Sequence, residues 1–196
     1  VIPLGLSRED YNIPTEDQLP ASTVALTKGE YIISISRFAN YKNIPLLIKA
    51  YSYVLEKMPK VKLFIIGSGP SYDRILRKIQ KNSLQESIIL LEEIDDVSKR
   101  FLLSRACCSV LASTSSAEAY GYVQLESMAM ACPVISFKIP YSGVSWVNQD
   151  KYTGLTLEIS KNKEVLARRL SEAIISIING AKERELYRAN CRKYSQ

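Results

Sequence analysis

Short apolar runs rich in β-branched residues alternate along the chain with segments whose apolar residues recur at helical spacing. The runs are YIISIS (31–36), VKLFIIG (61–67), SIILL (87–91), CSVLAS (108–113), PVISF (133–137) and a weaker TGLTLE (153–158). Apolar strands separated by helices are typical of a parallel sheet covered on both faces. The pattern predicts an α/β, doubly wound, Rossmann-like sheet of about six strands with helices on both faces.

Helical periodicity fills the gaps between these runs. Apolar residues from Leu46 to Leu55 predict a helix that ends near Met58, and the next helix should turn Ile75 and Ile79 inward. Further helices are expected over about 97–106, from about residue 121, and over 163–178.

The start of the chain differs from the rest. The first 25 residues contain three prolines and mixed polarity, so we expect a linker or entry segment over 1–25 and one domain over 26–196. The chain begins at Val1 and its first methionine is Met58, so we expect a fragment that lacks a preceding N-terminal domain.

Composition excludes several classes of chemistry. The chain has no histidine, which rules out a Ser-His-Asp triad, a Cys-His pair and a histidine-ligated metal. The four cysteines lack paired metal-ligand spacing and indicate reduced thiols, so we expect a cytoplasmic protein. The net charge of +6 is dispersed and favours anionic partners without indicating nucleic-acid binding.

The expected sheet places its ligands outside the carboxyl ends of the strands. The loop after the first run holds Arg37 and Lys42, a fork and a mobile cation that suit a diphosphate. The loop after the second run holds Gly67 and Gly69, where backbone could approach a phosphate or sugar closely. It begins like a dinucleotide fingerprint, but Tyr72 occupies the third glycine position, so that match fails.

Two carboxylates frame the run AEAYGYVQLESMAMACPVI. Glu118 precedes the helix expected from about Gly121, and Glu126 lies within it. Carboxylates accept paired hydrogen bonds of the kind that vicinal sugar hydroxyls donate. Taken alone, Glu118 would be a partner of the helix dipole and Glu126 an ordinary helix residue. Their combination with Arg37 and Lys42 favours a site for a sugar nucleotide.

These segments together resemble the C-terminal, donor-binding domain of a GT-B glycosyltransferase of the retaining group 1, or family 4. The matching segments are VIPLGL, ISRFANYKN, LFIIGSGP, and EAYGYVQLE followed by ESMAMACPVIS. The resemblance implies transfer of a sugar from a UDP-, GDP- or ADP-sugar to a glycan or lipid-linked acceptor. Surface polysaccharide or lipopolysaccharide synthesis is the usual setting of such domains.

The resemblance also implies residue roles. Arg37 and Lys42 would hold and stabilise the leaving diphosphate, Glu118 would bind the transferred sugar, and Glu126 would bind the ribose. Other donor-binding positions would be Gly67, Gly69, Ala119, Tyr120, Gly121, Tyr122 and Val123, with a base pocket at Glu93 and Ile94. The family generally uses neither a metal nor a cofactor in transfer.

The acceptor would bind through the absent N-terminal domain, so we expect this chain by itself to complete no transfer. The resemblance also allows peripheral association of the whole enzyme with the inner face of a membrane. Two positions depart from the family pattern: Ala131 replaces a usual glycine, and Glu92 replaces a glycine close to the base.

Three other functions fit parts of the pattern. They are a nucleotide-sugar epimerase, for which no acid/base residues are found, a nicotinamide-dependent oxidoreductase, and a non-catalytic nucleotide-binding module.

Overall fold

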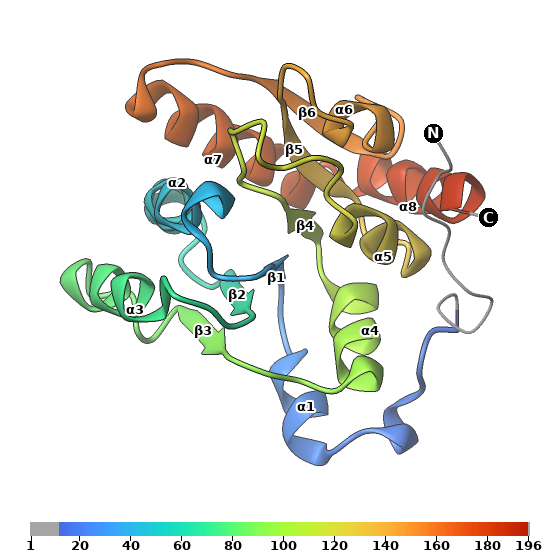
Figure 1. The fold of residues 1–196 in the computed structure, drawn as a ribbon. Helices are drawn as coiled ribbons and strands as arrows, with labels where there is room; N and C mark the ends of the chain where they lie inside the picture. The colour runs from blue at the N-terminus through green and yellow to red at the C-terminus, as the bar shows by residue number, and fades with distance from the viewer. Residues whose placement is uncertain (1–11, 196) are drawn as a thin grey trace.

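The computed structural model describes residues 12–195, and the rest of the expected entry segment, residues 1–11, lies outside them. Six parallel strands form one sheet in the order β3-β2-β1-β4-β5-β6 (Figure 1). The strands are β1 (Tyr31–Ile35), β2 (Lys62–Ile66), β3 (Ile88–Leu91), β4 (Cys108–Val110), β5 (Val134–Lys138) and β6 (Gly154–Glu158). The doubly wound α/β fold predicted from the apolar runs is confirmed.

Helices cover both faces of this sheet (Figure 1). One face carries α2 (Ile44–Lys57), α3 (Tyr72–Lys81) and α7 (Lys163–Asn179). The other carries α4 (Asp96–Arg105) and α5 (Val123–Ala129), which pack on each other. The chain ends in α8 (Ala181–Ser195), which packs against both α5 and α7.

The alternation of side chains along β1 shows how the core divides. Ile32 joins the large cluster under α2 and α7, whereas Tyr31 and Ile33 join the cluster under α4 and α5. Ile75 and Ile79 of α3 are buried, as their spacing predicts. The four central strands β1, β2, β4 and β5 are buried along most of their length, which explains their nearly continuous apolar sequence.

Several elements differ from the sequence expectation. The strand expected over 108–113 pairs as β4 only through Val110, and α5 begins at Val123, two residues later than expected. The sequence analysis also missed α1 (Ala21–Leu26), α6 (Val144–Val147), α8 and the short 3₁₀ helices at Glu16–Gln18 (η2) and Asn40–Lys42 (η3). The two 3₁₀ helices and α1 have no buried residue, and α6 is only four residues long, so none of these short elements carries a periodic signal.

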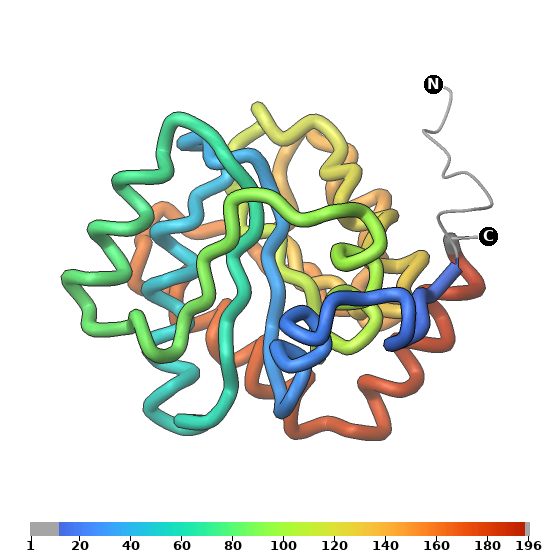
Figure 2. The backbone as a smooth tube through the Cα atoms, turned by 90° about the horizontal axis from the view of Figure 1, so that it is seen from below, coloured from blue at the N-terminus to red at the C-terminus, as the bar shows by residue number. Residues whose placement is uncertain are grey.

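The described part of the entry segment lies beside α4 in two views (Figures 1 and 2). Arg105, at the end of α4, pairs with Glu16 at 3.3 Å. Neither η2 nor α1 has a buried residue, so this segment adds little to the core. No helix in residues 12–195 is long and apolar enough to cross a bilayer.

Candidate functional site

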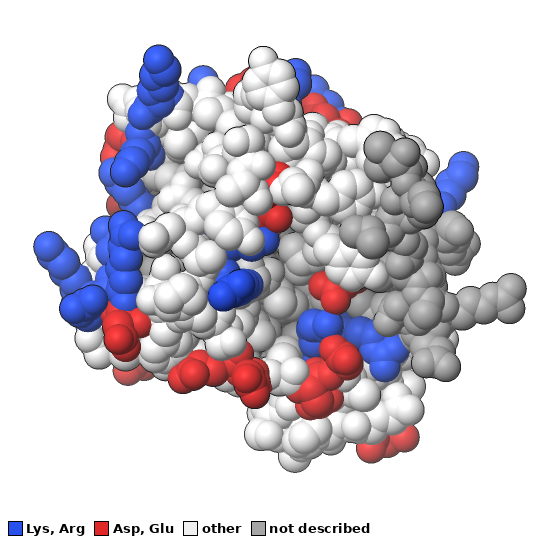
Figure 3. Space-filling model, in the orientation of Figure 1, with Lys and Arg blue, Asp and Glu red and all other residues white. Residues whose placement is uncertain are grey.

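The site lies where the strand order reverses. β1 and β4 are neighbours in the sheet, so the loops that follow them diverge and leave a crevice at the carboxyl edge. A cavity of about 680 Å³ lies there, between the loops after β1, β2 and β3 and the segment from β4 into α5. Cationic and anionic side chains meet near the centre of this face (Figure 3). The cavity is lined by Ile35, Ser36, Arg37, Lys42, Gly67, Ser68, Gly69, Glu92, Glu118, Tyr122, Val123 and Glu126.

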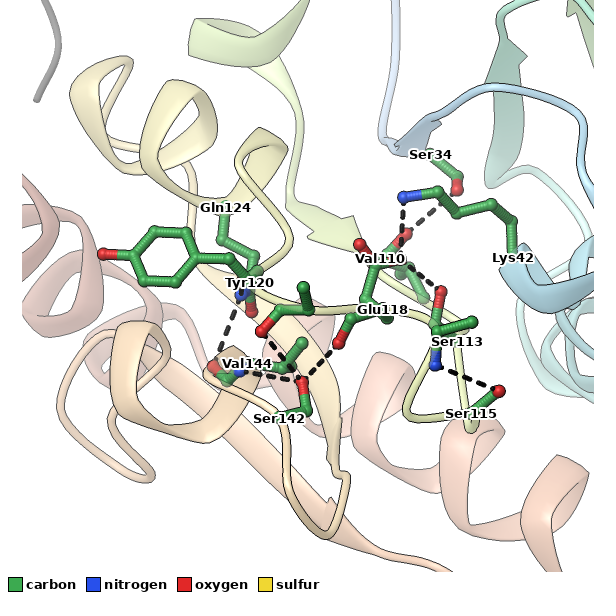
Figure 4. A network of polar contacts seen from close by, with 12 residues as sticks. Ser34, Lys42, Val110, Ser113, Ser115, Glu118, Tyr120, Gln124, Ser142 and Val144 are labelled. Atoms are coloured by element: carbon green, nitrogen blue, oxygen red, sulfur yellow. Dashed lines mark hydrogen bonds and ion pairs between the residues drawn. The ribbon is translucent and has the colours of Figure 1, made fainter. Parts of the chain in front are cut away.

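Lys42 and Glu118 form an ion pair at the centre of the site. Lys42 Nζ lies 2.7 Å from Glu118 Oε2, and the side chains are 12% and 6% exposed. Ser113 Oγ donates to the same carboxylate oxygen at 2.7 Å (Figure 4). Glu118 is therefore a buried carboxylate held by two donors, rather than a partner of the α5 dipole.

The loop that carries Lys42 is tied to the loop that carries Glu118. Asn43 adopts a left-handed backbone conformation, with φ 52°, which an asparagine tolerates better than most residues. Its side-chain amide donates to Thr114 Oγ1 at 3.3 Å, so it joins the β1–α2 loop to the β4–α5 loop. This link places Lys42 opposite Glu118, although the two residues are far apart in sequence.

The loop after β5 donates hydrogen bonds to the backbone of Glu118 and Ala119. Gly143 N–H donates to the carbonyl of Ala119 at 2.7 Å, and Ser142 Oγ donates to the carbonyl of Glu118 (Figure 4). A Cβ atom on Gly143 would lie 2.9 Å from the ring of Tyr120, so the close approach requires glycine. These contacts fix the backbone that aims Glu118 at the cavity.

The glycines after β2 allow the backbone of the β1–α2 loop to pack closely against them. Gly67 has φ +142°, and a Cβ there would lie 1.9 Å from the carbonyl oxygen of Ser36. Phe38 N–H donates to the carbonyl of Ser68 at 2.7 Å, which holds the β1–α2 and β2–α3 loops together. Gly67 and Gly69 line the cavity, but close backbone packing alone accounts for both glycines.

Arg37 is the exposed cation of the site. It lies two residues after the end of β1 and lines the cavity. Within residues 12–195, no carboxylate lies within ion-pair distance of its guanidinium. Its five donors are thus available to an anionic group, whereas Lys42 already has a carboxylate partner.

Glu126 also has a cationic partner. It is the fourth residue of α5, and its Oε1 lies 3.0 Å from Nζ of Lys99 on α4. Lys99 contacts Asp96 Oδ1 as well, at 2.8 Å. Burial alone would lower the pKa of Lys99, but the hydrogen bonds to Asp96 and Glu126 outweigh burial and raise the pKa. Both carboxylates singled out in the sequence are therefore paired with lysines.

The end of β3 places acidic groups at one side of the cavity. Glu92 lines the cavity, whereas Glu93 does not, and Ile94 packs against the core cluster under α4. Burial, with the nearby Glu92 carboxylate as the next cause, raises the pKa of Tyr72. The base pocket at Glu93 and Ile94 stays a prediction, and Glu92 is the acidic residue that faces the cavity from this loop.

The other expected donor-binding residues fall into two groups. Tyr122 and Val123 line the cavity, but Ala119, Tyr120 and Gly121 do not. Tyr120 instead packs against Trp146, with ring centroids 6.0 Å apart. Among the residues whose side chains are described, no group of three His, Cys, Asp or Glu side chains is arranged to hold a metal.

Sequence reasoning missed three side chains that act on this site: Ser113, Ser142 and Lys99. Ser113 ends the apolar run 108–113 and Ser142 lies in the loop after 133–137, so both were at strand ends already marked for attention. Lys99 lies one helical turn after Asp96, and its sequence neighbourhood gave no signal of a contact with Glu126.

Comparisons with known proteins agree on one family for this chain. The family model described as glycosyl transferases group 1 matches residues 15–194. The poly(glycerol-phosphate) alpha-glucosyltransferase of Bacillus subtilis is 31% identical over 146 residues, which cover 74% of this chain and 20% of that protein. The alpha-monoglucosyldiacylglycerol synthase of Streptococcus pneumoniae is 32% identical over 146 residues, which cover 72% of this chain and 33% of that protein.

A solved structure shares the fold along almost the whole chain. The Anabaena protein HepE, in complex with UDP-glucose, has a TM-score of 0.76 and 17% identity, over 97% of this chain and 49% of that one. The chain described here thus spans half or less of the length of each of these three proteins.

Proposed function

Because the chain belongs to the glycosyl transferases group 1 family, we propose that it is the donor-binding half of a retaining glycosyltransferase. The reaction moves a sugar from a nucleotide-diphosphate sugar to a glycan or lipid-linked acceptor. The observation that carries this proposal is that one cavity at the carboxyl edge is lined by Arg37, Lys42, Glu118 and Glu126 together. Two cations and two carboxylates match the diphosphate and the two sets of hydroxyls of a sugar nucleotide.

The diphosphate binds at the cationic part of the cavity. Arg37 has an exposed guanidinium, and Lys42 can contact a phosphate oxygen from the Glu118 side. As the bond between the sugar and the diphosphate breaks, negative charge accumulates on the leaving phosphate. Fixed cations placed there stabilise that charge with little reorganisation.

The two carboxylates divide the hydroxyls of the donor. The diphosphate carries the transferred sugar at one end and the ribose at the other. Glu118, beside Lys42, binds the transferred sugar in this proposal. Glu126 lies on α5, in contact with α4, and binds the ribose. The base then lies toward the end of β3, where Glu92 lines the cavity.

The comparisons support the donor class and the stereochemistry. The HepE structure named above holds UDP-glucose, and both curated relatives are named for α-glucosyl products or activities. UDP-glucose carries its sugar in α linkage, so an α product from such a donor corresponds to retention. The lipid product in the second relative's name supports an acceptor at a membrane surface, reached by peripheral association.

The donor binds without a metal in this proposal, since Arg37 and Lys42 supply cationic charge on one loop. Addition of EDTA should leave the affinity for UDP or GDP unchanged. A large loss of affinity that Mg²⁺ or Mn²⁺ restores would contradict this part of the proposal.

Calorimetric titration of the chain with UDP, GDP, ADP and NAD tests the function directly. We expect one nucleoside diphosphate to bind at micromolar to millimolar concentration and NAD to bind more weakly or not at all. Preferential binding of NAD would favour an oxidoreductase, and the absence of binding by all four nucleotides would overturn the proposal.

A further inference from the structure

Glu126 presents its two carboxylate oxygens to different surroundings. The residue lines the cavity and its side chain is 25% exposed. Oε1 lies 3.0 Å from Lys99 Nζ, and Oε2 has no hydrogen bond or ion pair to another side chain within residues 12–195. One oxygen of this carboxylate is therefore fixed by a cation, while the other is available to a ligand.

Lys99 approaches Glu126 from outside the cavity. It does not line the cavity, it lies on a different helix, and its side chain is 22% exposed. Its position is set by the first turn of α4, where Asp95 accepts hydrogen bonds from the backbone N–H of Ser98 at 2.8 Å and from Ser98 Oγ at 2.6 Å. Asp96 then holds Lys99 Nζ from one turn earlier on α4.

A glutamate side chain on a helix surface samples several rotamers, and a ligand that needs one of them must order it. A cation behind the carboxylate selects the rotamer in advance and leaves the second oxygen facing the cavity. We propose that Lys99 is a positioning residue that orients the Glu126 carboxylate toward the vicinal hydroxyls of the nucleotide ribose. This inference rests on the proposed function, because it takes the ribose to bind at Glu126.

The contrasting interpretation is an ion pair that only joins α4 to α5. Such a pair would change stability when broken and would affect all ligands equally. A positioning residue instead changes the part of the binding energy that comes from the ribose hydroxyls. Comparison of UDP with 2′,3′-dideoxy-UDP isolates that part, because the two ligands share the base and the diphosphate.

The experiment measures dissociation constants of both ligands by calorimetry, with the guanosine pair in parallel, for the unchanged chain and its variants. Lys99→Met keeps the apolar stem and removes the charge, and it should weaken UDP binding by roughly three- to ten-fold with little effect on the dideoxy ligand. Lys99→Arg should restore most of the preference for UDP. Lys138→Met is the matched control, because it breaks an exposed pair with Glu158 outside the cavity.

Epistasis decides whether Lys99 acts through Glu126. Glu126→Gln should reduce the preference for UDP over the dideoxy ligand, and Lys99→Met should add little in that background. Lys99→Gln serves as a second variant if Lys99→Met does not fold. An unchanged preference for UDP in Lys99→Met and Lys99→Gln, with only a lower melting temperature, would overturn the inference.

Failure of the inference is distinguishable from failure of the proposed function. If the unchanged chain binds UDP or GDP and Glu126→Gln abolishes the preference while Lys99→Met and Lys99→Gln retain it, only the inference fails. If the unchanged chain binds neither nucleotide, the proposed function fails, and the inference fails with it.

Discussion

Charged cavities lie at both edges of the sheet, and they use their cations differently. At the carboxyl edge, Lys42 and Lys99 pair with Glu118 and Glu126, which line the 680 Å³ cavity. At the amino edge, a cavity of about 510 Å³ is lined by arginines and acidic residues. Its charged residues are Glu30, Arg105, Arg184, Glu185, Arg188 and Arg192.

Two of the amino-edge arginines on α8, Arg184 and Arg188, bind backbone carbonyls. Arg188 donates to the carbonyls of Ser104 and Ala106 at 3.1 and 2.6 Å, and to that of Ala131 at 3.1 Å. Arg184 donates to the carbonyl of Ile178 at 3.0 Å. These carbonyls lie at the ends of α4, α5 and α7, where carbonyls lack helical partners and the helix dipole favours a cation.

The two edges differ in the group that a ligand would have to displace from each cation. A carboxylate partner can share or exchange its cation with a phosphate by a side-chain movement. A helix-end carbonyl that loses its donor becomes an unsatisfied backbone group, so a ligand that removed Arg188 would destabilise the fold. Arg184 and Arg188 also lie 3.6 Å from the carboxylates of Glu30 and Glu185. Their bonds to helix-end carbonyls indicate a structural role for these two arginines, while the pairs at the carboxyl edge indicate binding.

The largest effect is expected at the amino edge. Arg188→Met removes the donor from three carbonyls, and it should lower the free energy of unfolding by about 3 kcal/mol. The affinity of the folded protein for UDP or GDP should not change. Urea unfolding and calorimetry measure the two quantities, and Lys193→Met on the exposed part of α8 is the control. Loss of nucleotide affinity with unchanged stability would reverse the comparison between the edges.

Arg37→Ala should have the opposite signature. Its guanidinium is exposed and contacts no carboxylate among the described residues, so stability should change by no more than about 0.5 kcal/mol. Removal of a charge-assisted bond to the diphosphate should weaken UDP or GDP binding by about ten-fold or more. Arg77→Ala, an exposed cation on α3, should alter neither quantity. A stability loss in Arg37→Ala as large as that of Arg188→Met would remove the distinction.

Glu118→Gln separates the two ends of the donor. The substitution removes the charge that holds Lys42, so Lys42 becomes free to bind the diphosphate. Binding of UDP should stay the same or strengthen by a few-fold, while UDP-glucose should lose about ten-fold relative to UDP because its hydroxyls lose a charged acceptor. Equal weakening of both ligands, together with a lower melting temperature, would show that Glu118 only supports its loop.

Sequence periodicity predicted the sheet because each strand and helix carries its own local pattern. Ile75 and Ile79, for example, sit one turn apart and are both buried. Helix α8 escaped prediction because its sequence is mostly polar, with Tyr187 and Cys191 as its buried apolar residues. A helix anchored by Arg184 and Arg188 on carbonyls presents almost no apolar face to detect.

The candidate site divides in the same way. Arg37, Lys42, Glu118 and Glu126 were marked because residue type and strand-end position are visible in the sequence. Their pairing was not visible, because the Lys42–Glu118 and Lys99–Glu126 contacts depend on how separate loops and helices pack. Sequence reasoning therefore located the charged groups and left their electrostatic partners to the structure.

The smallest effect concerns Ala131, which lines the amino-edge cavity and whose carbonyl accepts a hydrogen bond from Arg188. It follows α5 with φ 54°, its N–H donates to the carbonyl of Met128 at 2.8 Å, and Cys132 N–H donates to Ser127 at 2.9 Å. This is the Schellman ending of a helix, in which the left-handed residue is usually glycine. The geometry explains why glycine is usual here in the resembling family and why alanine is strained.

Ala131→Gly relieves the strain of the left-handed conformation but gives the unfolded chain more freedom, and the two effects partly cancel. The left-handed conformation costs an alanine about 1–2 kcal/mol, and the added freedom costs about 0.4–1 kcal/mol. We therefore expect a net gain of about 0.5 kcal/mol, or roughly 1–2 °C in melting temperature.

The control is Ala129→Gly, within α5, which should lower stability by about 1 kcal/mol or more. Nucleotide affinity should stay constant in both variants, because neither residue lines the carboxyl-edge cavity. If Ala131→Gly were as destabilising as Ala129→Gly, the restricted backbone of Ala131 would be needed to hold its carbonyl in place for Arg188. The stability of the amino edge would then depend more on backbone conformation than on the arginine side chains.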